Sequence, residues 1–150
     1  MRLVIQRVKE ASVKVGPEFT GKIEKGLLVL VGVEHGDTED DARWLASKTT
    51  SLRIFNDENG VMNLSVKDID GQVLAVSQFT LTASTRKGNR PSYIRAAGHE
   101  LATSLYEKYC IMTEEILGRH TEKGVFGADM QVSLINDGPV TIIIDSRLRE

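Results

Sequence analysis

The sequence of 150 residues contains a single cysteine, Cys110. It cannot form a disulfide within the chain, and a reducing compartment such as the cytoplasm is therefore expected. No apolar run is long enough to cross a bilayer, and the first residues lack the apolar region of a signal peptide, so we expect no membrane partner. The formal net charge of −2 provides no overall attraction to nucleic acid. DNA is not expected as a partner, and RNA would have to be bound by a local basic patch or by shape.

The common catalytic and metal-binding motifs are also missing. There is no Cys-x-x-Cys, His-Glu-x-x-His or Gly-x-Gly-x-x-Gly pattern and no Gly-x-Ser-x-Gly elbow. We expect the three histidines, His35, His99 and His120, to be solvated in loops or near helix ends. Cys110 falls inside a predicted helix, where an inert and partly buried thiol is expected. The sequence therefore predicts no metal site and no Ser-His-Asp triad.

The composition, 41% hydrophobic and 27% charged, is typical of a globular protein, and the length fits one domain over residues 1–150. Apolar patterning predicts strands, a helix, strands, a second helix and strands. This order indicates an α+β fold with a mostly antiparallel, barrel-like sheet and two main helices. The expected strands cover residues 3–9, 11–15, 19–24, 27–33, 52–55, 61–64, 72–79, 130–135 and 140–145, and the expected helices run from Thr38 to about 50 and from about Gly98 to Gly118.

The stretch Asn136-Asp137-Gly138-Pro139-Val140-Thr141 lies between the last two expected strands. Asp-Gly between β-branched runs is a strong hairpin signal, because glycine accepts the positive φ that tight turns need. Proline donates no backbone hydrogen bond, so it belongs at a strand's first residue or on an edge. Either this is only a rigid turn of a closing hairpin, or the turn presents backbone carbonyls to a ligand.

Hydroxyl and amide groups gather in Ser77-Gln78-Phe79-Thr80-Leu81, at the end of a predicted central strand. Strand ends leave backbone N–H groups free to bind an anion or a carbonyl oxygen. Without a general base nearby in the sequence, a serine or threonine is a weak nucleophile, so such a site would work by positioning and oxyanion stabilisation. The alternative is a polar strand terminus without a role.

A basic segment follows this strand. Residues 82–92 are almost free of apolar side chains and contain Arg86, Lys87 and Arg90. A charge run of this kind is commonly a solvated surface. Its functional interpretation is contact with phosphate groups of a nucleic acid.

Taken together, the Ser77–Leu81 and Asn136–Thr141 motifs closely resemble the motif pair of D-aminoacyl-tRNA deacylases. The resemblance extends over nearly the whole chain, and both motifs in this order and at this length are specific. Other matching blocks are Gln6-Arg7-Val8, Leu52-Arg53-Ile54-Phe55, Met62-Asn63-Leu64-Ser65-Val66, Thr85-Arg86-Lys87-Gly88, Arg90-Pro91-Ser92 and Phe126-Gly127-Ala128-Asp129-Met130-Gln131-Val132.

The resemblance implies a homodimeric cytoplasmic enzyme without cofactor that hydrolyses the ester between a D-amino acid, or mischarged glycine, and tRNA. It implies that a cis Gly138-Pro139 peptide reaches into the partner's site and excludes L side chains. The Phe79 N–H and the Thr80 hydroxyl would polarise the ester, and the 2′-hydroxyl of the tRNA would assist the attacking water. The site residues implied are Ser77, Gln78, Phe79 and Thr80 for catalysis; Arg7, Phe126, Gly127, Met130, Asn136, Gly138, Pro139 and Thr141 for substrate binding and chiral rejection; and Arg86, Lys87 and Arg90 for tRNA.

Two alternatives from other classes remain open. A non-catalytic tRNA-binding module would use Arg86, Lys87 and Arg90 and release nothing. A purely structural dimer would use Gly138-Pro139 only as a turn. The intact Ser77–Thr80 segment argues against the tRNA-binding module. A salt-sensitive gel shift with tRNA would distinguish that module from the structural dimer.

Overall fold

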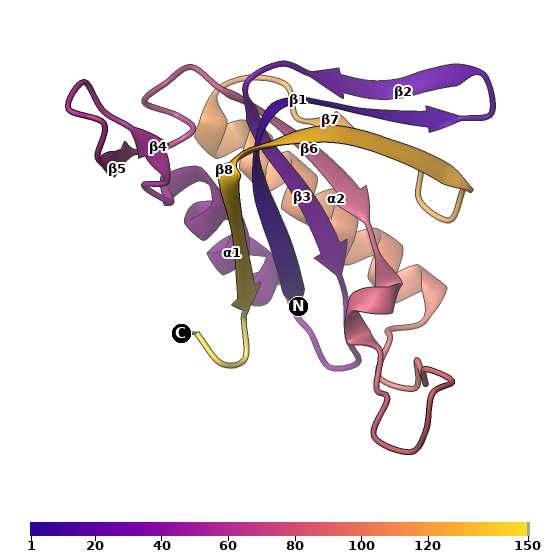
Figure 1. Cartoon of the computed structure of the whole chain (residues 1–150). Helices are drawn as coiled ribbons and strands as arrows, with labels where there is room; N and C mark the ends of the chain where they lie inside the picture. Colours follow the sequence, from indigo (N-terminus) through magenta and orange to yellow (C-terminus); the bar gives the residue numbers. More distant parts are fainter. Residues whose placement is uncertain (150) are drawn as a thin grey trace.

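A computed structural model describes residues 1–149 of the chain (Figure 1). Its centre is a six-stranded curved sheet with the order β2-β1-β3-β6-β7, in which β8 pairs along the other side of β1. A separate two-stranded sheet joins β4 and β5. The strands are β1 (Arg2–Val15), β2 (Glu18–Ile23), β3 (Gly26–Gly32), β4 (Phe55–Asn56), β5 (Met62–Leu64), β6 (Gln72–Ser77), β7 (Glu122–Lys123) and β8 (Met130–Asp145).

The expected α+β class is confirmed, but the sheet is mixed rather than mostly antiparallel. β1 pairs antiparallel with β2, β3 and β8, whereas β3 pairs parallel with β6 and β6 pairs parallel with β7. The parallel pairs arise because a helix crosses over between β3 and β6 and another between β6 and β7. Central strands covered on both faces are apolar throughout, and β3 and β6 have this pattern.

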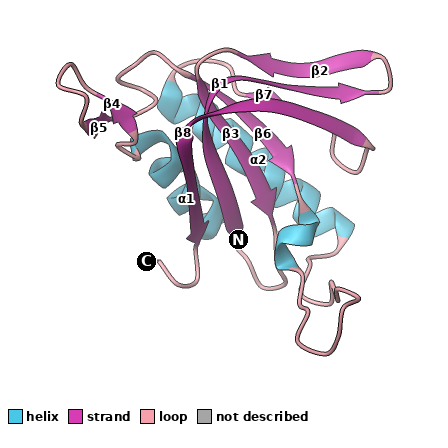
Figure 2. Ribbon diagram, in the orientation of Figure 1, coloured by secondary structure: helices cyan, strands magenta, loops and turns pink. Residues whose placement is uncertain are grey.

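The two helices lie side by side against one face of the sheet, behind it in Figure 2. Helix α1 (Glu39–Ser51) begins after Thr38, whose backbone N–H donates to the Asp41 carboxylate at 2.8 Å. Helix α2 (His99–Leu117) ends at Gly118, which has a φ of +74°, a conformation that glycine adopts without penalty. Both expected helices are therefore confirmed. Their ends could be predicted because helix caps depend on residues that are close together in the sequence.

The closing hairpin was a wrong prediction. Residues 130–135 and 140–145 do not pair with each other, and both belong to the single strand β8, which pairs with β1 along its whole length. The expected strands 3–9 and 11–15 form one continuous strand, β1, which is 14 residues long. One edge of β1 is therefore long enough to pair with residues 130–135 and with residues 140–145. Between the pairs Gln6–Thr141 and Val8–Asn136, Arg7 lies opposite residues 137–140. The predicted turn is therefore a bulge in a continuous strand.

Smaller differences concern strand ends. The strand expected at 52–55 is limited to Phe55–Asn56. The strand expected at 72–79 stops at Ser77, two residues before the 3₁₀ turn η1 (Phe79–Thr82). The short β7 was not expected. No helix among the described residues is both long and apolar enough to span a membrane.

Candidate active site

A pocket of about 270 Å³ lies at the carboxyl end of β6. It is lined by residues from β3, β6, the start of α2 and the segment that leads into β8, so four distant parts of the sequence meet there. Its walls are mostly apolar, and none of the lining side chains is ionisable. The lining residues are Val31, Val33, Val76, Ser77, Gln78, Phe79, Ala97, Ala102, Phe126, Gly127, Ala128, Met130 and Val132.

The first wall is the turn from β6 into η1. Ser77 is the last residue paired with β3, and the Gln78 N–H donates to the Val31 carbonyl at 2.8 Å. The Phe79 N–H opens η1, where the first amides have no partner within the helix, and it donates to no group in residues 1–149. This amide is therefore free to bind a carbonyl oxygen next to the pocket.

The side chains of this turn are ordered by their neighbours. Gln78 Nε2 donates to Thr80 Oγ1 at 2.5 Å, which leaves the Thr80 hydroxyl hydrogen available to another acceptor. Thr80 is not among the lining residues, although it follows them directly. The Phe79 ring is 56% exposed and packs edge-to-face on Tyr93, with the ring centroids 5.0 Å apart.

The opposite wall comes from the segment before β8. The Phe126 ring lies between His99 and Tyr106, with centroid distances of 5.3 and 5.9 Å. The Tyr106 hydroxyl donates to the Ala75 carbonyl at 2.9 Å, and burial raises the pKa of Tyr106, so it stays neutral and structural. Gly127 has a φ of +77°, which turns the chain toward Met130 at the start of β8. The predicted residues Phe126, Gly127 and Met130 are thus brought together with Ser77, Gln78 and Phe79.

The Gly138-Pro139 bulge lies elsewhere, outside the lining of the pocket in the same chain. Both residues are exposed, and their peptide bond is cis, as the resemblance implies. Arg7 is buried beneath the bulge: its Nε donates to the Asp137 carbonyl at 3.0 Å and its Nη1 to the Ile54 carbonyl at 2.7 Å. The guanidinium group therefore ties the bulge to the chain before β4.

Two further predicted residues flank the bulge. The Asn136 side-chain amide donates to the carbonyls of Arg7 and Val140, both at 3.0 Å, and so closes the bulge across its base. Thr141 is exposed, and its Oγ1 accepts from Gln6 Nε2 at 3.4 Å. Asn136 therefore has a structural role on these contacts, whereas the Thr141 hydroxyl faces solvent.

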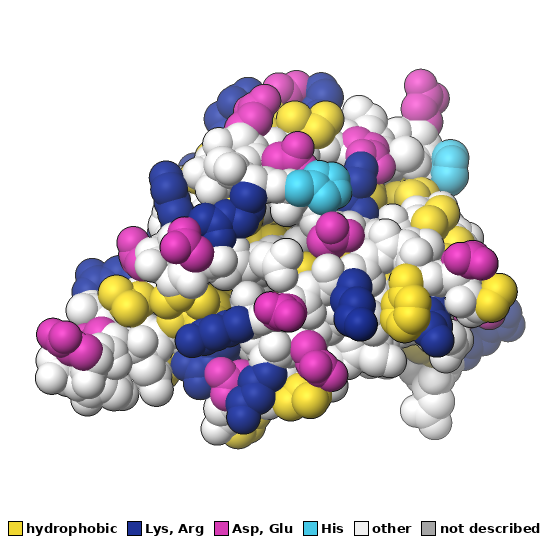
Figure 3. All heavy atoms as spheres, turned by 90° about the horizontal axis from the view of Figure 1, so that it is seen from above, with side chains coloured by type: hydrophobic (Ala, Val, Ile, Leu, Met, Phe, Trp, Pro, Cys, Tyr) yellow, Lys and Arg dark blue, Asp and Glu magenta, His cyan; other side chains and the backbone are white. Residues whose placement is uncertain are grey.

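The basic residues Arg86, Lys87 and Arg90 are exposed in a loop closed at its base by two backbone hydrogen bonds of 2.9 Å between Ser84 and Ser92. The loop projects away from the sheet in Figure 1. On the face shown in Figure 3, positive and negative side chains alternate without a broad patch of one sign.

The titratable groups considered in the sequence lie outside the lining of the pocket. His35, His99 and His120 are exposed, as predicted. Cys110 is buried in α2, and this burial raises its pKa to about 12, so the thiol stays protonated. Within residues 1–149, no cluster of three or more His, Cys, Asp or Glu residues could hold a metal ion. The pocket can thus act by shape and hydrogen bonding.

Several residues of this site were not predicted from the sequence. Ala97 and Ala102 line the pocket near the start of α2, where their small side chains leave room beside Phe126. Arg2 and Arg95 donate to carbonyls of η1 from distant parts of the chain. Ala102 falls at helical spacing with the buried Tyr106, Tyr109 and Thr113, so this spacing could have placed it on the buried face of α2. No local pattern links the two arginines to η1.

Comparisons with known proteins identify the family of this chain. A family model described as D-Tyr-tRNA(Tyr) deacylase matches residues 4–145. Proteins named "D-aminoacyl-tRNA deacylase" from Akkermansia muciniphila and Flavobacterium psychrophilum are 60% and 58% identical over the full length of both chains.

Two solved structures share the fold. One is named "c-Myc DNA Unwinding Element Binding Protein" and has a TM-score of 0.90 and 38% identity, covering 97% of this chain and 98% of that chain. The other, described as a probable eukaryotic D-amino acid tRNA deacylase, has a TM-score of 0.82 at 15% identity over 95% of this chain and 97% of that chain, which supports the fold alone. The match over nearly the whole sequence and the high identity to the bacterial enzymes establish that the chain belongs to the D-Tyr-tRNA(Tyr) deacylase family, a family of hydrolases.

Proposed function

We propose that this protein hydrolyses the ester bond of D-aminoacyl-tRNA, and of glycine mischarged on tRNA, and that it does so in the cytoplasm as a homodimer of single-domain subunits. The observation that carries the proposal is the pocket at the end of β6, where residues 77–79 meet Phe126, Gly127 and Met130. A pocket without an ionisable side chain suits a reaction catalysed by positioning and by polarisation of a carbonyl group.

In this mechanism the ester carbonyl of the substrate accepts a hydrogen bond from the Phe79 N–H and lies near the Thr80 hydroxyl. A water molecule, oriented by the 2′-hydroxyl of the terminal adenosine, attacks the carbonyl carbon. The bond from that carbon to the 3′ oxygen of the ribose breaks, and the proton lost by the water passes to this oxygen. The free amide and the free hydroxyl hydrogen are the two groups that would stabilise the developing negative charge.

Chiral rejection is assigned to the Gly138-Pro139 bulge of the partner subunit. The bulge is exposed, firmly held by Arg7 and absent from the pocket of its own chain, which suits insertion into a second copy. Its carbonyls would accept hydrogen bonds from the α-amino group of the substrate and leave no space for an L side chain. Exclusion by a clash discriminates more steeply than a missing contact does.

Other predicted residues take supporting roles in this proposal. Asn136 keeps the bulge closed, and Arg7 orients it. The Thr141 hydroxyl stays a weaker candidate for chemistry than Thr80, because it is solvent-exposed beside the bulge. Arg86, Lys87 and Arg90 would contact phosphates of the tRNA, where glycine in the same loop lets the backbone approach closely.

The test is a deacylation time course with D-tyrosyl-tRNA and L-tyrosyl-tRNA in the presence of a chelator. Rapid loss of the D ester alone is expected, and it would support the activity, the chiral pocket and the independence from a metal. Loss of both esters would remove the chiral role of Gly138-Pro139. Loss of neither, from folded and dimeric protein, would contradict the activity and favour a non-catalytic tRNA-binding module.

The name of the 38% identical structure refers to DNA binding by that protein. We do not propose DNA as a partner of this chain, because its formal net charge of −2 provides no overall attraction to nucleic acid. A gel-shift titration with duplex DNA beside tRNA would test this, with binding expected for tRNA only.

A further inference from the structure

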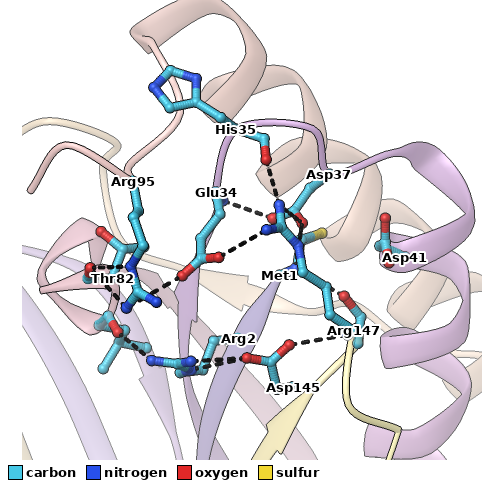
Figure 4. A network of polar contacts seen from close by, with 12 residues as sticks. Met1, Arg2, Glu34, His35, Asp37, Asp41, Thr82, Arg95, Asp145 and Arg147 are labelled. Atoms are coloured by element: carbon cyan, nitrogen blue, oxygen red, sulfur yellow. Dashed lines mark hydrogen bonds and ion pairs between the residues drawn. The ribbon is translucent and has the colours of Figure 1, made fainter. Parts of the chain in front are cut away.

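The last carbonyls of η1 are held by two arginines from distant parts of the chain. Arg2 Nη1 donates to the Leu81 carbonyl at 3.0 Å, and Arg95 donates to the Thr82 carbonyl from Nη2 at 3.1 Å and from Nε at 3.3 Å. Figure 4 shows the Arg95 side chain against Thr82 and the Arg2 side chain extended toward Asp145. Carbonyls at the end of a short helix have no partner within it, so these bonds satisfy groups that would otherwise be unpaired.

Each arginine also has a carboxylate beside it. Arg2 Nη2 pairs with Asp145 Oδ2 at 2.9 Å, and Arg95 Nη2 lies 3.7 Å from Glu34 Oε1. Arg147 joins the two carboxylates, because its backbone N–H donates to Asp145 at 2.9 Å and its Nη1 lies 3.3 Å from Glu34 Oε2. The Glu34 side chain is only 6% exposed, and a buried carboxylate that loses its partners is strongly destabilising. Arg2 and Arg95 therefore belong to one charged network, in which Arg95 and Glu34 form an ion pair without a hydrogen bond.

The turn itself has little intrinsic stability. η1 has four residues, and its bonds include Leu81 N–H to the Gln78 carbonyl at 3.2 Å and Ala83 N–H to the Thr80 carbonyl at 3.1 Å. Short 3₁₀ turns have poor hydrogen-bond geometry and depend on their surroundings. The direction of the Phe79 N–H thus depends on contacts made at the other end of the turn.

On the basis of the function proposed above, we propose that Arg2 and Arg95 are positioning residues: they hold η1 so that the Phe79 N–H and the Thr80 hydroxyl point at the ester carbonyl. Neither arginine lines the pocket, so neither is expected to touch the reacting atoms. Their effect should fall on the chemical step, because a displacement of about 1 Å at a reacting group can cost about a hundredfold in rate.

Arg95→Ala tests this inference under single-turnover conditions with D-tyrosyl-tRNA. We expect the maximal rate to fall by about tenfold to a hundredfold, with little change in the half-saturating enzyme concentration. Arg95→Lys keeps the charge and one donor, so it should recover part of the rate. A rise in the half-saturating concentration alone would overturn the inference, since Arg95 would then bind tRNA.

Arg119→Ala is the matched control. Arg119 also donates to a backbone carbonyl, that of Gly71 at 3.0 Å, and also pairs with a carboxylate, Asp70, at 2.9 Å, but at the opposite end of β6. We expect this variant to keep the wild-type maximal rate. If Arg119→Ala and Arg95→Ala lose rate equally, the effect is a general loss of stability, and the inference is wrong.

Hydrogen exchange measured by mass spectrometry gives a readout that does not depend on activity. Residues 78–83 should exchange faster in Arg95→Ala and in Arg2→Lys than in wild type or Arg119→Ala. Without the arginine contacts, η1 should open more often and expose the amide hydrogens of Leu81 and Ala83 to exchange. Unchanged exchange there would overturn the positioning role. If the wild-type protein does not deacylate, the proposed function fails, while this comparison still decides whether the arginines hold the turn.

Discussion

Gly138→Ala probes the bulge directly. Gly138 has a φ of +127°, where L residues are rarely found, and a Cβ built there would lie 2.7 Å from Arg7 Nη2 and 3.0 Å from Val140 Cγ2. The backbone strain alone should lower the free energy of unfolding by about 1–3 kcal/mol. If Arg7 moves away and loses its bond to the Asp137 carbonyl, a further cost of about 1.5–3 kcal/mol is expected for a charged hydrogen bond.

The functional consequence concerns selectivity. A shifted bulge would no longer place its carbonyls at the substrate amino group, and the extra methyl would narrow the partner's pocket. We expect the rate ratio for D-tyrosyl-tRNA over L-tyrosyl-tRNA to fall by about tenfold or more, which corresponds to about 1.4 kcal/mol of lost discrimination. The assay is the time course with both esters, together with urea unfolding of the same preparations.

Gly16→Ala is the control for this experiment. Gly16 lies in the turn between β1 and β2 with a φ of +57°, and no atom lies within 4 Å of the Cβ that alanine would add. It should cost about 1 kcal/mol of stability through the backbone alone and leave the D to L ratio unchanged. If Gly138→Ala matches Gly16→Ala in both stability and ratio, the assignment of the bulge to chiral rejection is refuted.

Two more predictions concern the catalytic turn and the basic loop. Thr80→Ala should lower deacylation by about tenfold or more, because one polarising group is removed, while the unfolding midpoint stays close to wild type; a wild-type rate would remove Thr80 from the mechanism. Replacing Arg86 or Arg90 by alanine should weaken tRNA binding. A plot of log affinity against log salt concentration should become less steep by about one unit for each phosphate contact that is lost. An unchanged slope would show that the loop does not touch phosphate.

Local patterns in the sequence were a good guide where neighbouring residues decide the outcome. The limits of α1 and α2 follow from Thr38 and Gly118, and the central strands follow from the apolar runs of β3 and β6. Local patterns were a poor guide to pairing. Asp137-Gly138 predicted a hairpin, but the long edge of β1 accepts the residues on both sides of it.

The candidate site divides in the same way. The motifs Ser77–Leu81 and Asn136–Thr141 could be picked out from their residue types and their resemblance to a family. The separation of the two motifs in space could not be predicted from the sequence. Residues 77–79 share a pocket with Phe126 and Met130, whereas Gly138 and Pro139 lie outside it. Crossovers by two helices bring the first set together, and no local pattern encodes which strands those helices connect.

By itself, the sequence determined the types of element, the helix ends and the chemical groups available, because these depend on interactions between residues a few positions apart. Only the tertiary structure decided that β8 is one strand with a bulge, that the pocket contains no ionisable side chain, and that Arg2 and Arg95 support η1. These features join residues as far apart as Arg2 and Asp145. Contacts of that range are selected by how the whole sheet and both helices bury their apolar surfaces together.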